Sequence, residues 1–142
     1  MLNKVIDILC NYTNWKTPHI SSENIALFSL ENNVELFLFA TNTNDIVFYV
    51  ELMQLPQENP YQFIHDIAQK NIGMYKIKKS ILSISNNFLT LHRTLKNDQI
   101  NQTNIINLTK EILNDADIWK NILSKKQESS SPFSFSFNNI LR

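Results

Sequence analysis

The sequence has little of several features that mark particular protein classes. Its 142 residues include one cysteine, Cys10, and one glycine, Gly73. An intramolecular disulfide and a glycine-rich phosphate-binding loop are therefore excluded. Thirteen basic and thirteen acidic residues leave no net charge at pH 7. The short basic stretch at 76–79 is typical of a solvated face, so we predict no nucleic-acid partner.

Long hydrophobic runs are also missing. No uninterrupted apolar stretch reaches the roughly 20 residues that span a bilayer, and the first residues, MLNKVIDILCNYTNW, lack the pattern of a secretory signal. We therefore expect a cytoplasmic protein with no membrane partner. A chain of this length buries roughly 70% of its unfolded surface and needs no metal to fold. We expect one domain over residues 1–127 and a C-terminal tail over 128–142.

Residues with catalytic or metal-binding chemistry are few and scattered. His19, His65 and His92 fall in a predicted turn, helix and strand, without metal-ligand spacing to another His, Cys or carboxylate. Glu35 and Glu51 fall at alternating strand positions, where a solvated face explains them better than acid–base chemistry. We predict no enzyme, no metal and no cofactor. An enzyme using His65 or His92 stays open as an alternative, and it requires a cleft with perturbed titratable groups.

Hydrophobic periodicity predicts the order of the elements. Apolar residues recur at helical spacing in three segments and in alternation in five others. Short Asn-rich turns between neighbouring strands favour antiparallel pairing, so we predict an α+β sandwich in which helices pack on an antiparallel sheet. The predicted elements are a helix at 2–14, strands at 25–30, 34–41 and 45–55, a helix from 59–60 to about 73, a hairpin at 79–85 and 88–95, and a helix at 101–124.

Three short signals support these boundaries. Asn59 and Pro60 form a typical helix start, because Asn can cap free N–H groups and proline fits the first helical position. Gly73 follows the last apolar residue of this helix, where we expect a left-handed residue to end it. Asn86 and Asn87 lie between two alternating segments and indicate a hairpin turn.

The central strands are apolar on both faces. Val34, Leu36 and Leu38 fall on one side of a strand, and Phe37 and Phe39 fall on the other. A sheet with one wet face carries polar residues at alternate positions. Either helices of the same chain cover both faces, or another chain covers one of them.

This pattern resembles the Tir-chaperone family, the class I chaperones of bacterial type III secretion, over residues 1 to about 125. The resemblance rests on the element order and on two stretches, ELMQLP with ENPYQFIHDIAQKNI, and SILSISNNFLTLHRTLKNDQINQTNIINLTKEIL. It implies a non-catalytic protein that holds the extended N-terminal chaperone-binding segment of an effector in the bacterial cytoplasm and keeps it soluble and ready for secretion. An adaptor or sensor of similar sandwich fold, unrelated to secretion, is the alternative.

The resemblance also implies partners and contact residues. It implies a homodimer joined through the second helix and the following strand, and it adds the secretion ATPase to the effector as a partner. The implied dimer residues are Phe63, Ile64, Ile67, Ala68, Leu82 and Ile84. The implied effector-binding residues are Val5, Leu9, Phe28, Phe37, Phe39, Val47 and Tyr49.

The predicted tail has a pattern of its own. Phe133, Phe135 and Phe137 alternate with serines, so an extended backbone places three aromatic rings on one side. Such a segment has the form of a peptide that adds a strand to a sheet or docks in an apolar groove. The alternative is a tail whose rings are solvated.

Overall fold

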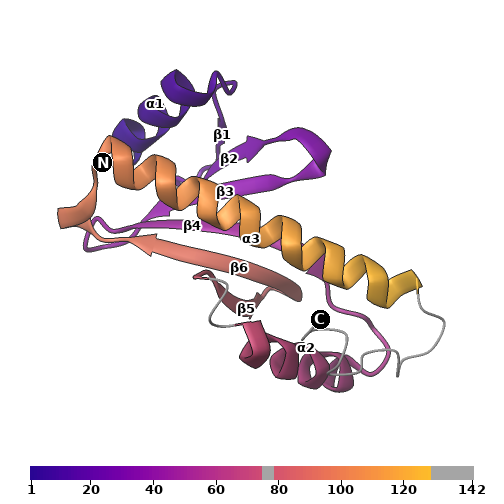
Figure 1. The fold of residues 1–142 in the computed structure, drawn as a ribbon. Coiled ribbons are helices and arrows are strands. Elements are labelled where there is room, and N and C mark those ends of the chain that lie inside the picture. Colours follow the sequence, from indigo (N-terminus) through magenta and orange to yellow (C-terminus); the bar gives the residue numbers. More distant parts are fainter. Residues whose placement is uncertain (75–78, 129–142) are drawn as a thin grey trace.

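The computed structural model describes residues 1–74 and 79–128, and the predicted element order is confirmed there with one short strand added (Figure 1). Lys76, Lys78 and residues 129–142, which include the three phenylalanines of the predicted tail, lie outside the described residues. The main elements are α1 (Leu2–Thr13), β1 (His19–Ile20), β2 (Ala26–Ser29), β3 (Glu35–Ala40), β4 (Ile46–Gln54), α2 (Pro60–Met74), β5 (Ile81–Ser85), β6 (Phe88–Leu95) and α3 (Gln102–Glu128), with short 3₁₀ turns at Glu31–Asn33 and Asn97–Gln99.

The six strands form one antiparallel sheet in the order β1-β2-β3-β4-β6-β5. β4 is the longest strand and lies at the centre, between β3 and β6. The register between β4 and β6 shifts between Glu51 and Met53, which marks a bulge that bends the strand. β1 and β5 form the two edges.

Helices α1 and α3 cover one face of the sheet (Figure 1). Phe48 and Leu91 point from the sheet into this core, and Ile105, Ile112 and Trp119 of α3 meet them; all five are fully buried. Burying an apolar side chain of this size stabilises the fold by roughly 1.5–3 kcal/mol. The predicted apolar stripe of the last helix is therefore confirmed as the main partner of the sheet.

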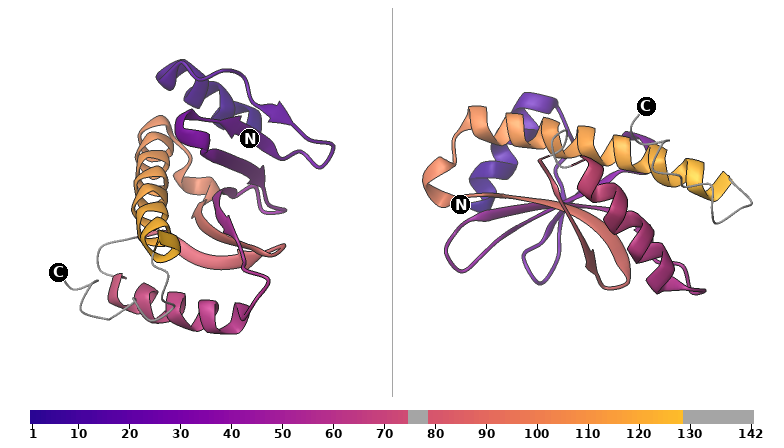
Figure 2. Two further views of the ribbon diagram at one scale, coloured as in Figure 1. Left: turned by 90° about the vertical axis from the view of Figure 1, so that its right-hand side faces the viewer. Right: turned by 60° about the horizontal axis from the view of Figure 1, so that its bottom comes forward.

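The second helix stands apart from the other two. α2 lies beside β5 at one edge of the molecule, and the opposite face of the sheet has no described helix over it (Figure 2). Phe63 and Ile67 of α2 are buried, whereas Tyr61 and Ile72 are 85% and 70% exposed. α2 therefore contributes to the core on one side and presents apolar residues to solvent on the other.

The structure overturns the role predicted for the single glycine. α2 continues through Gly73 to Met74, and in the described residues no glycine has a positive φ. A glycine inside a helix costs only about 1 kcal/mol relative to alanine, so it need not end one. The left-handed positions belong to asparagines instead. All eight described non-glycine residues with positive φ are Asn, because the Asn side chain tolerates this region best.

Two of these asparagines form the predicted β5–β6 hairpin, which is confirmed. Ser85 pairs with Phe88, and the two residues between them, Asn86 and Asn87, have φ of 49° and 68°. Two consecutive positive φ values are typical of a type I′ turn, whose twist matches that of the flanking strands. Asn14 has the same conformation at the end of α1, where its N–H donates to the Cys10 carbonyl at 3.0 Å.

Polar contacts attach the sheet to α3. The Glu111 carboxylate accepts hydrogen bonds from Arg93 Nη1 at 2.7 Å and from Lys79 Nζ at 3.3 Å. Asp115 Oδ2 accepts a hydrogen bond from the backbone N–H of Ser80 at 3.0 Å. The hydrogen bonds from Arg93 and Lys79 lower the pKa of Glu111 against the effect of burial. Together these contacts fix β6 and the start of β5 against the helix.

Candidate functional site

The face of the sheet opposite α1 and α3 is the surface on which the candidate site lies. We call it the open face. The strand pairings connect one residue from each strand into a row that crosses this face, and strand alternation places these residues on the same side. This row is His19, Leu27, Phe37, Tyr49, His92 and Ile81.

An aromatic cluster occupies the middle of the open face. The rings of Phe37 and Tyr49 are stacked, with centroids 4.6 Å apart and planes 5° from parallel. Phe39 meets Tyr49 edge to face at 6.1 Å, and Val47 pairs with Phe39 across the strands. All four side chains are half-buried. Phe39, Val47 and Tyr49 line a shallow hollow of about 430 Å³ whose other walls are polar residues of β5 and β6, including His92.

Carboxylates adjoin this cluster. The register of β3 and β4, continued by one residue, places Glu35 opposite Glu51 on the open face, next to the Phe37–Tyr49 pair. Burial and the nearby Glu35 charge raise the pKa of Glu51. Burial, Glu51 and Glu23 raise the pKa of Tyr49. The open face therefore combines apolar rings with carboxylates that form no ion pair within residues 1–74 and 79–128.

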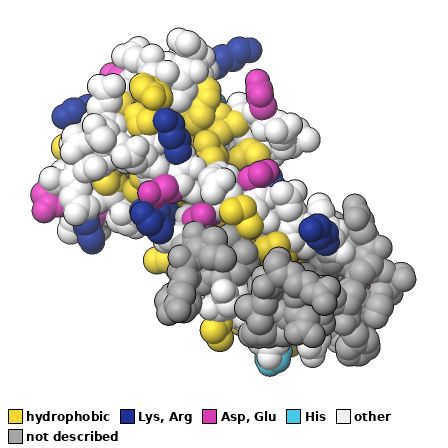
Figure 3. All heavy atoms as spheres, viewed as in Figure 1, with side chains coloured by type: hydrophobic (Ala, Val, Ile, Leu, Met, Phe, Trp, Pro, Cys, Tyr) yellow, Lys and Arg dark blue, Asp and Glu magenta, His cyan; other side chains and the backbone are white. Residues whose placement is uncertain are grey.

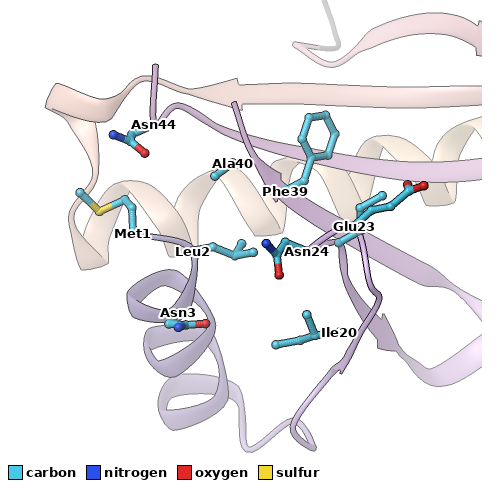
Figure 4. Close-up of a pocket in the computed structure, with 10 residues that line it drawn as sticks. Met1, Leu2, Asn3, Ile20, Glu23, Asn24, Phe39, Ala40 and Asn44 are labelled. Carbon is cyan, nitrogen blue, oxygen red and sulfur yellow. The ribbon is translucent and has the colours of Figure 1, made fainter. Parts of the chain in front are cut away.

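A second hollow lies at the edge of the sheet, where the start of α1 approaches β1 (Figure 4). It has a volume of about 530 Å³ and is lined by Met1, Leu2, Ile20 and Phe39, with Glu23 beside them. Phe39 lines both this hollow and the one on the open face. The two hollows therefore adjoin at one ring and form a continuous surface from the sheet centre to its β1 edge.

A third hollow lies on the helix side of the molecule. It has a volume of about 810 Å³ between the end of α1, the β2–β3 turn and α3, and Trp15, Phe28, Leu30, Val34 and Leu113 supply its apolar walls. Figure 3 views the molecule from this side and shows apolar side chains gathered between α1 and the β2–β3 hairpin. Charges of both signs also line this hollow, so it lacks the one-sided character of the open face.

The predicted effector-binding residues separate into two groups. Phe37, Phe39, Val47 and Tyr49 lie together on the open face. The other three are buried between the sheet and the helices and have almost no accessible surface in this structure, because the apolar stripe of α1 packs inward. These three are Val5, Leu9 and Phe28. Sequence periodicity located that stripe, but it could not tell a core-facing stripe from one that contacts a partner.

The predicted dimer residues separate in a similar way. Phe63 and Ile67 are buried in the protomer's own core, Ile64 and Leu82 are half-buried, and Ala68 and Ile84 are exposed. The exposed apolar residues that sequence reasoning missed lie on the same two elements: Tyr61 and Ile72 on α2, and Ile81 on β5. The spacing of Tyr61, His65, Ala68 and Ile72 is a second helical stripe that could have identified this exposed side.

The described residues give the enzyme alternative no complete site. His92 Nδ1 lies 3.1 Å from Ser83 Oγ, which also lies 3.0 Å from Thr90 Oγ1. Within residues 1–74 and 79–128, no carboxylate pairs with His92, and no three His, Cys, Asp or Glu side chains are grouped to hold a metal. In the same residues, no helix is long and apolar enough to cross a membrane.

The sequence matches a known family over most of its length. A model of the Tir chaperone protein (CesT) family matches residues 14–120. A search of curated proteins finds no match.

Three solved structures have a similar fold. A chain of the ExsC–ExsE complex aligns with a TM-score of 0.68 and 11% identity, over 86% of this chain and 92% of that one. The Yersinia pestis type III secretion chaperone SycH, in complex with a stable fragment of YscM2, aligns with a TM-score of 0.59 and 10% identity, over 83% and 98%. A chain of the HopA1–SchA chaperone–effector complex aligns with a TM-score of 0.64 and 9% identity, over 84% and 93%.

Proposed function

Because this chain belongs to the Tir chaperone protein (CesT) family, whose members are non-enzymatic type III secretion chaperones that bind effector proteins, we propose that it holds an extended N-terminal effector segment on its open face. This family membership decides against an adaptor unrelated to secretion. Holding the segment in this way keeps the effector soluble and secretion-competent in the cytoplasm. The secretion ATPase stays a predicted further partner.

The observation that carries this proposal is the aromatic cluster of Phe37, Phe39 and Tyr49. The rings of Phe37 and Phe39 both pack against Tyr49 on a sheet face that no described helix covers. These rings are half-buried in the protomer, so a partner gains only from the aromatic area that is still exposed, on the order of 1 kcal/mol for each ring. Contiguous apolar surface of this kind usually marks an interaction site.

The edge hollow supports an extended conformation for the bound segment. β1 is an edge strand of two residues, and Ile20 on it is 44% exposed. A free edge can pair with an added strand through main-chain hydrogen bonds, while pockets accept alternate side chains. Since Phe39 lines both the edge hollow and the central one, a single segment can contact both.

We also propose that the chain forms a homodimer through the exposed sides of α2 and β5. Tyr61, Ile72, Ile81 and Ile84 are 85%, 70%, 58% and 45% exposed. Tyr61, Ala68 and Ile72 share one side of α2, while Ile81 and Ile84 leave both faces of the edge strand β5 exposed. A two-fold interface uses such a patch twice and favours apolar residues over charges at its centre.

Capture of the client tests the proposed function. Tagged protein is produced in its native bacterium, and the co-purifying secreted protein is identified by mass spectrometry. We expect Phe39→Asp and Tyr49→Asp to abolish its capture while the circular dichroism spectrum is kept. Asn107→Asp, on the exposed side of α3, is the matched control and should leave capture intact. Undiminished capture by both open-face variants would remove this face from the proposal.

Light scattering tests the dimer separately. Ile72→Asp should convert the dimer to a monomer, because a buried unpaired charge opposes association. Tyr12→Asp, a change at an exposed aromatic residue of α1, should leave the dimer mass unchanged. If Ile72→Asp keeps the dimer mass, α2 does not form the interface.

A further inference from the structure

In residues 1–74 and 79–128, the strands contribute glutamates but no lysine or arginine to the open face. From the strand registers and strand alternation, this face receives His19 from β1, Leu27 and Ser29 from β2, Glu35, Phe37 and Phe39 from β3, Val47, Tyr49 and Glu51 from β4, Ile81, Ser83 and Ser85 from β5, and Phe88, Thr90, His92 and Thr94 from β6. Two of these residues are glutamates and none is lysine or arginine. Glu23, in the turn before β2, adds a third carboxylate beside Phe39 (Figure 4).

This arrangement of carboxylates does not stabilise the isolated protein. Like charges opposite each other on neighbouring strands destabilise a sheet. No lysine or arginine in residues 1–74 and 79–128 forms an ion pair with Glu23, Glu35 or Glu51. By contrast, Glu111 on the covered side is paired with both Arg93 and Lys79. Burial, and then the neighbouring Glu35 charge, raise the pKa of Glu51.

We propose that the segment bound on the open face is basic as well as apolar, with lysine or arginine side chains that pair with Glu35 and Glu51. The inference rests on the proposed function, since it specifies the client of the same site. Tyr49 and Glu51 are two residues apart on β4, about 6.6 Å along the strand. A parallel or antiparallel extended segment has the same repeat, so an apolar residue followed two positions later by a basic one fits both groups.

Two other occupants fit less well. A second copy of the chain, placed with its open face against this one, would bring further glutamates to Glu35 and Glu51, and like charges at an interface oppose association. The chain's own segment from Phe133 to Phe137 is apolar and contains no basic residue. A basic client is the occupant that satisfies both the rings and the carboxylates.

Synthetic peptides test the inference directly. Three fluorescent peptides share one core in which Leu, Phe and Val stand at alternate positions. They differ only at the position two residues after the apolar residues, which is Lys, Gln or Glu. Fluorescence anisotropy measures their affinity for the full chain, for Glu35→Gln/Glu51→Gln, and for Glu31→Gln/Glu58→Gln. The last variant makes the same change in net charge at two exposed positions away from the open face.

We expect the unmodified chain to bind the Lys peptide roughly fivefold more tightly than the Gln peptide at low salt, and the Glu peptide more weakly than both. Glu35→Gln/Glu51→Gln should remove this preference and keep its affinity for the Gln peptide, whereas Glu31→Gln/Glu58→Gln should keep the preference. Equal binding of all three peptides by the unmodified chain overturns the charge inference alone. Absence of binding by every peptide overturns the apolar site as well.

Discussion

The two faces of the sheet are made from alternate residues of the same strands, but they differ in how their apolar residues are covered and how their charges are paired. The covered face is closed by α1 and α3, and its ionic contacts, such as Arg93 with Glu111, are paired. The open face carries stacked rings, and its carboxylates form no ion pair with the lysines and arginines of residues 1–74 and 79–128. Under the proposed function, the covered face serves folding and the open face serves binding, since like charges next to apolar surface contribute little to the stability of the protomer.

The comparison is sharpest at two adjacent residues of β4. Phe48 points into the covered core and is fully buried, whereas Tyr49 stacks on Phe37 on the open face and is half-buried. The two are similar in size and lie in the same strand. Their different surroundings should therefore separate the requirements of folding from those of binding.

Truncating the covered-face residue should have the largest effect on folding. Phe48→Ala leaves a cavity among fully buried neighbours, so we expect the free energy of unfolding to fall by about 3–5 kcal/mol. Urea denaturation followed by circular dichroism measures this loss. A loss below about 1 kcal/mol would mean that the covered face is less tightly packed than its burial indicates.

Truncating the neighbour on the open face should affect stability much less. Tyr49→Ala removes one stacked and one edge-to-face ring contact, which are together worth roughly 1–2 kcal/mol. The same change should abolish client capture, which Phe48→Leu, a milder change in the core, should preserve. If Tyr49→Ala unfolds the protein, the open face belongs to the core and the contrast between the faces is lost.

The ion pair on the covered face should produce an acid-dependent stability. The pKa of Glu111 is lowered by its hydrogen bonds with Arg93 and Lys79. The contribution of Glu111 to the free energy of unfolding is therefore present at pH values above the ordinary pKa of 4.5, and it is lost as the pH falls through the lowered pKa. Its side chain is 36% exposed, which limits the contribution through solvent screening. Glu111→Gln should therefore cost roughly 0.5–1 kcal/mol at pH 7, and this difference should vanish in acid. A difference that persists at the acid end would point to packing instead.

The Glu51 carboxylate on the open face should give a smaller effect of opposite sign. Burial and Glu35 raise the pKa of Glu51, so its protonated form favours the fold at low pH and this benefit is lost as the pH rises through the raised value. Glu51→Gln should raise the free energy of unfolding at pH 7 by roughly 0.3–0.5 kcal/mol. Thermal melts at pH 7 and at acid pH measure it. Destabilisation at pH 7 would indicate an internal partner for Glu51.

Local signals in the sequence were sufficient to predict the element order. Alternation identified the strands, helical spacing identified the buried stripe of α3, and Asn86 with Asn87 identified the hairpin. The prediction for Gly73 failed because a glycine signal does not tell a helix end from a helix interior. β1 was missed because two residues give no periodicity.

The candidate site was predictable only in part. Alternation placed Phe37 and Phe39 on a common face, and pairing brought Tyr49 against both. Sequence alone could not show that Val5, Leu9 and Phe28 pack inward, because an amphipathic stripe is the same whether it meets a core or a partner. The sequence predicted that Glu35 and Glu51 lie on a solvated face. That they stand opposite each other follows only from the strand register.

The central claim is that the open face holds the client, and site-specific photocrosslinking tests it most directly. A photoreactive amino acid is placed at Val47 on the open face or, as the control, at Lys110 on the exposed side of α3, and each protein is irradiated with the co-purified client bound. We predict a covalent adduct from position 47 and none from position 110, with peptide sequencing placing the attachment in an extended segment that contains basic residues. Adduct formation from position 110 with none from position 47 would contradict the account.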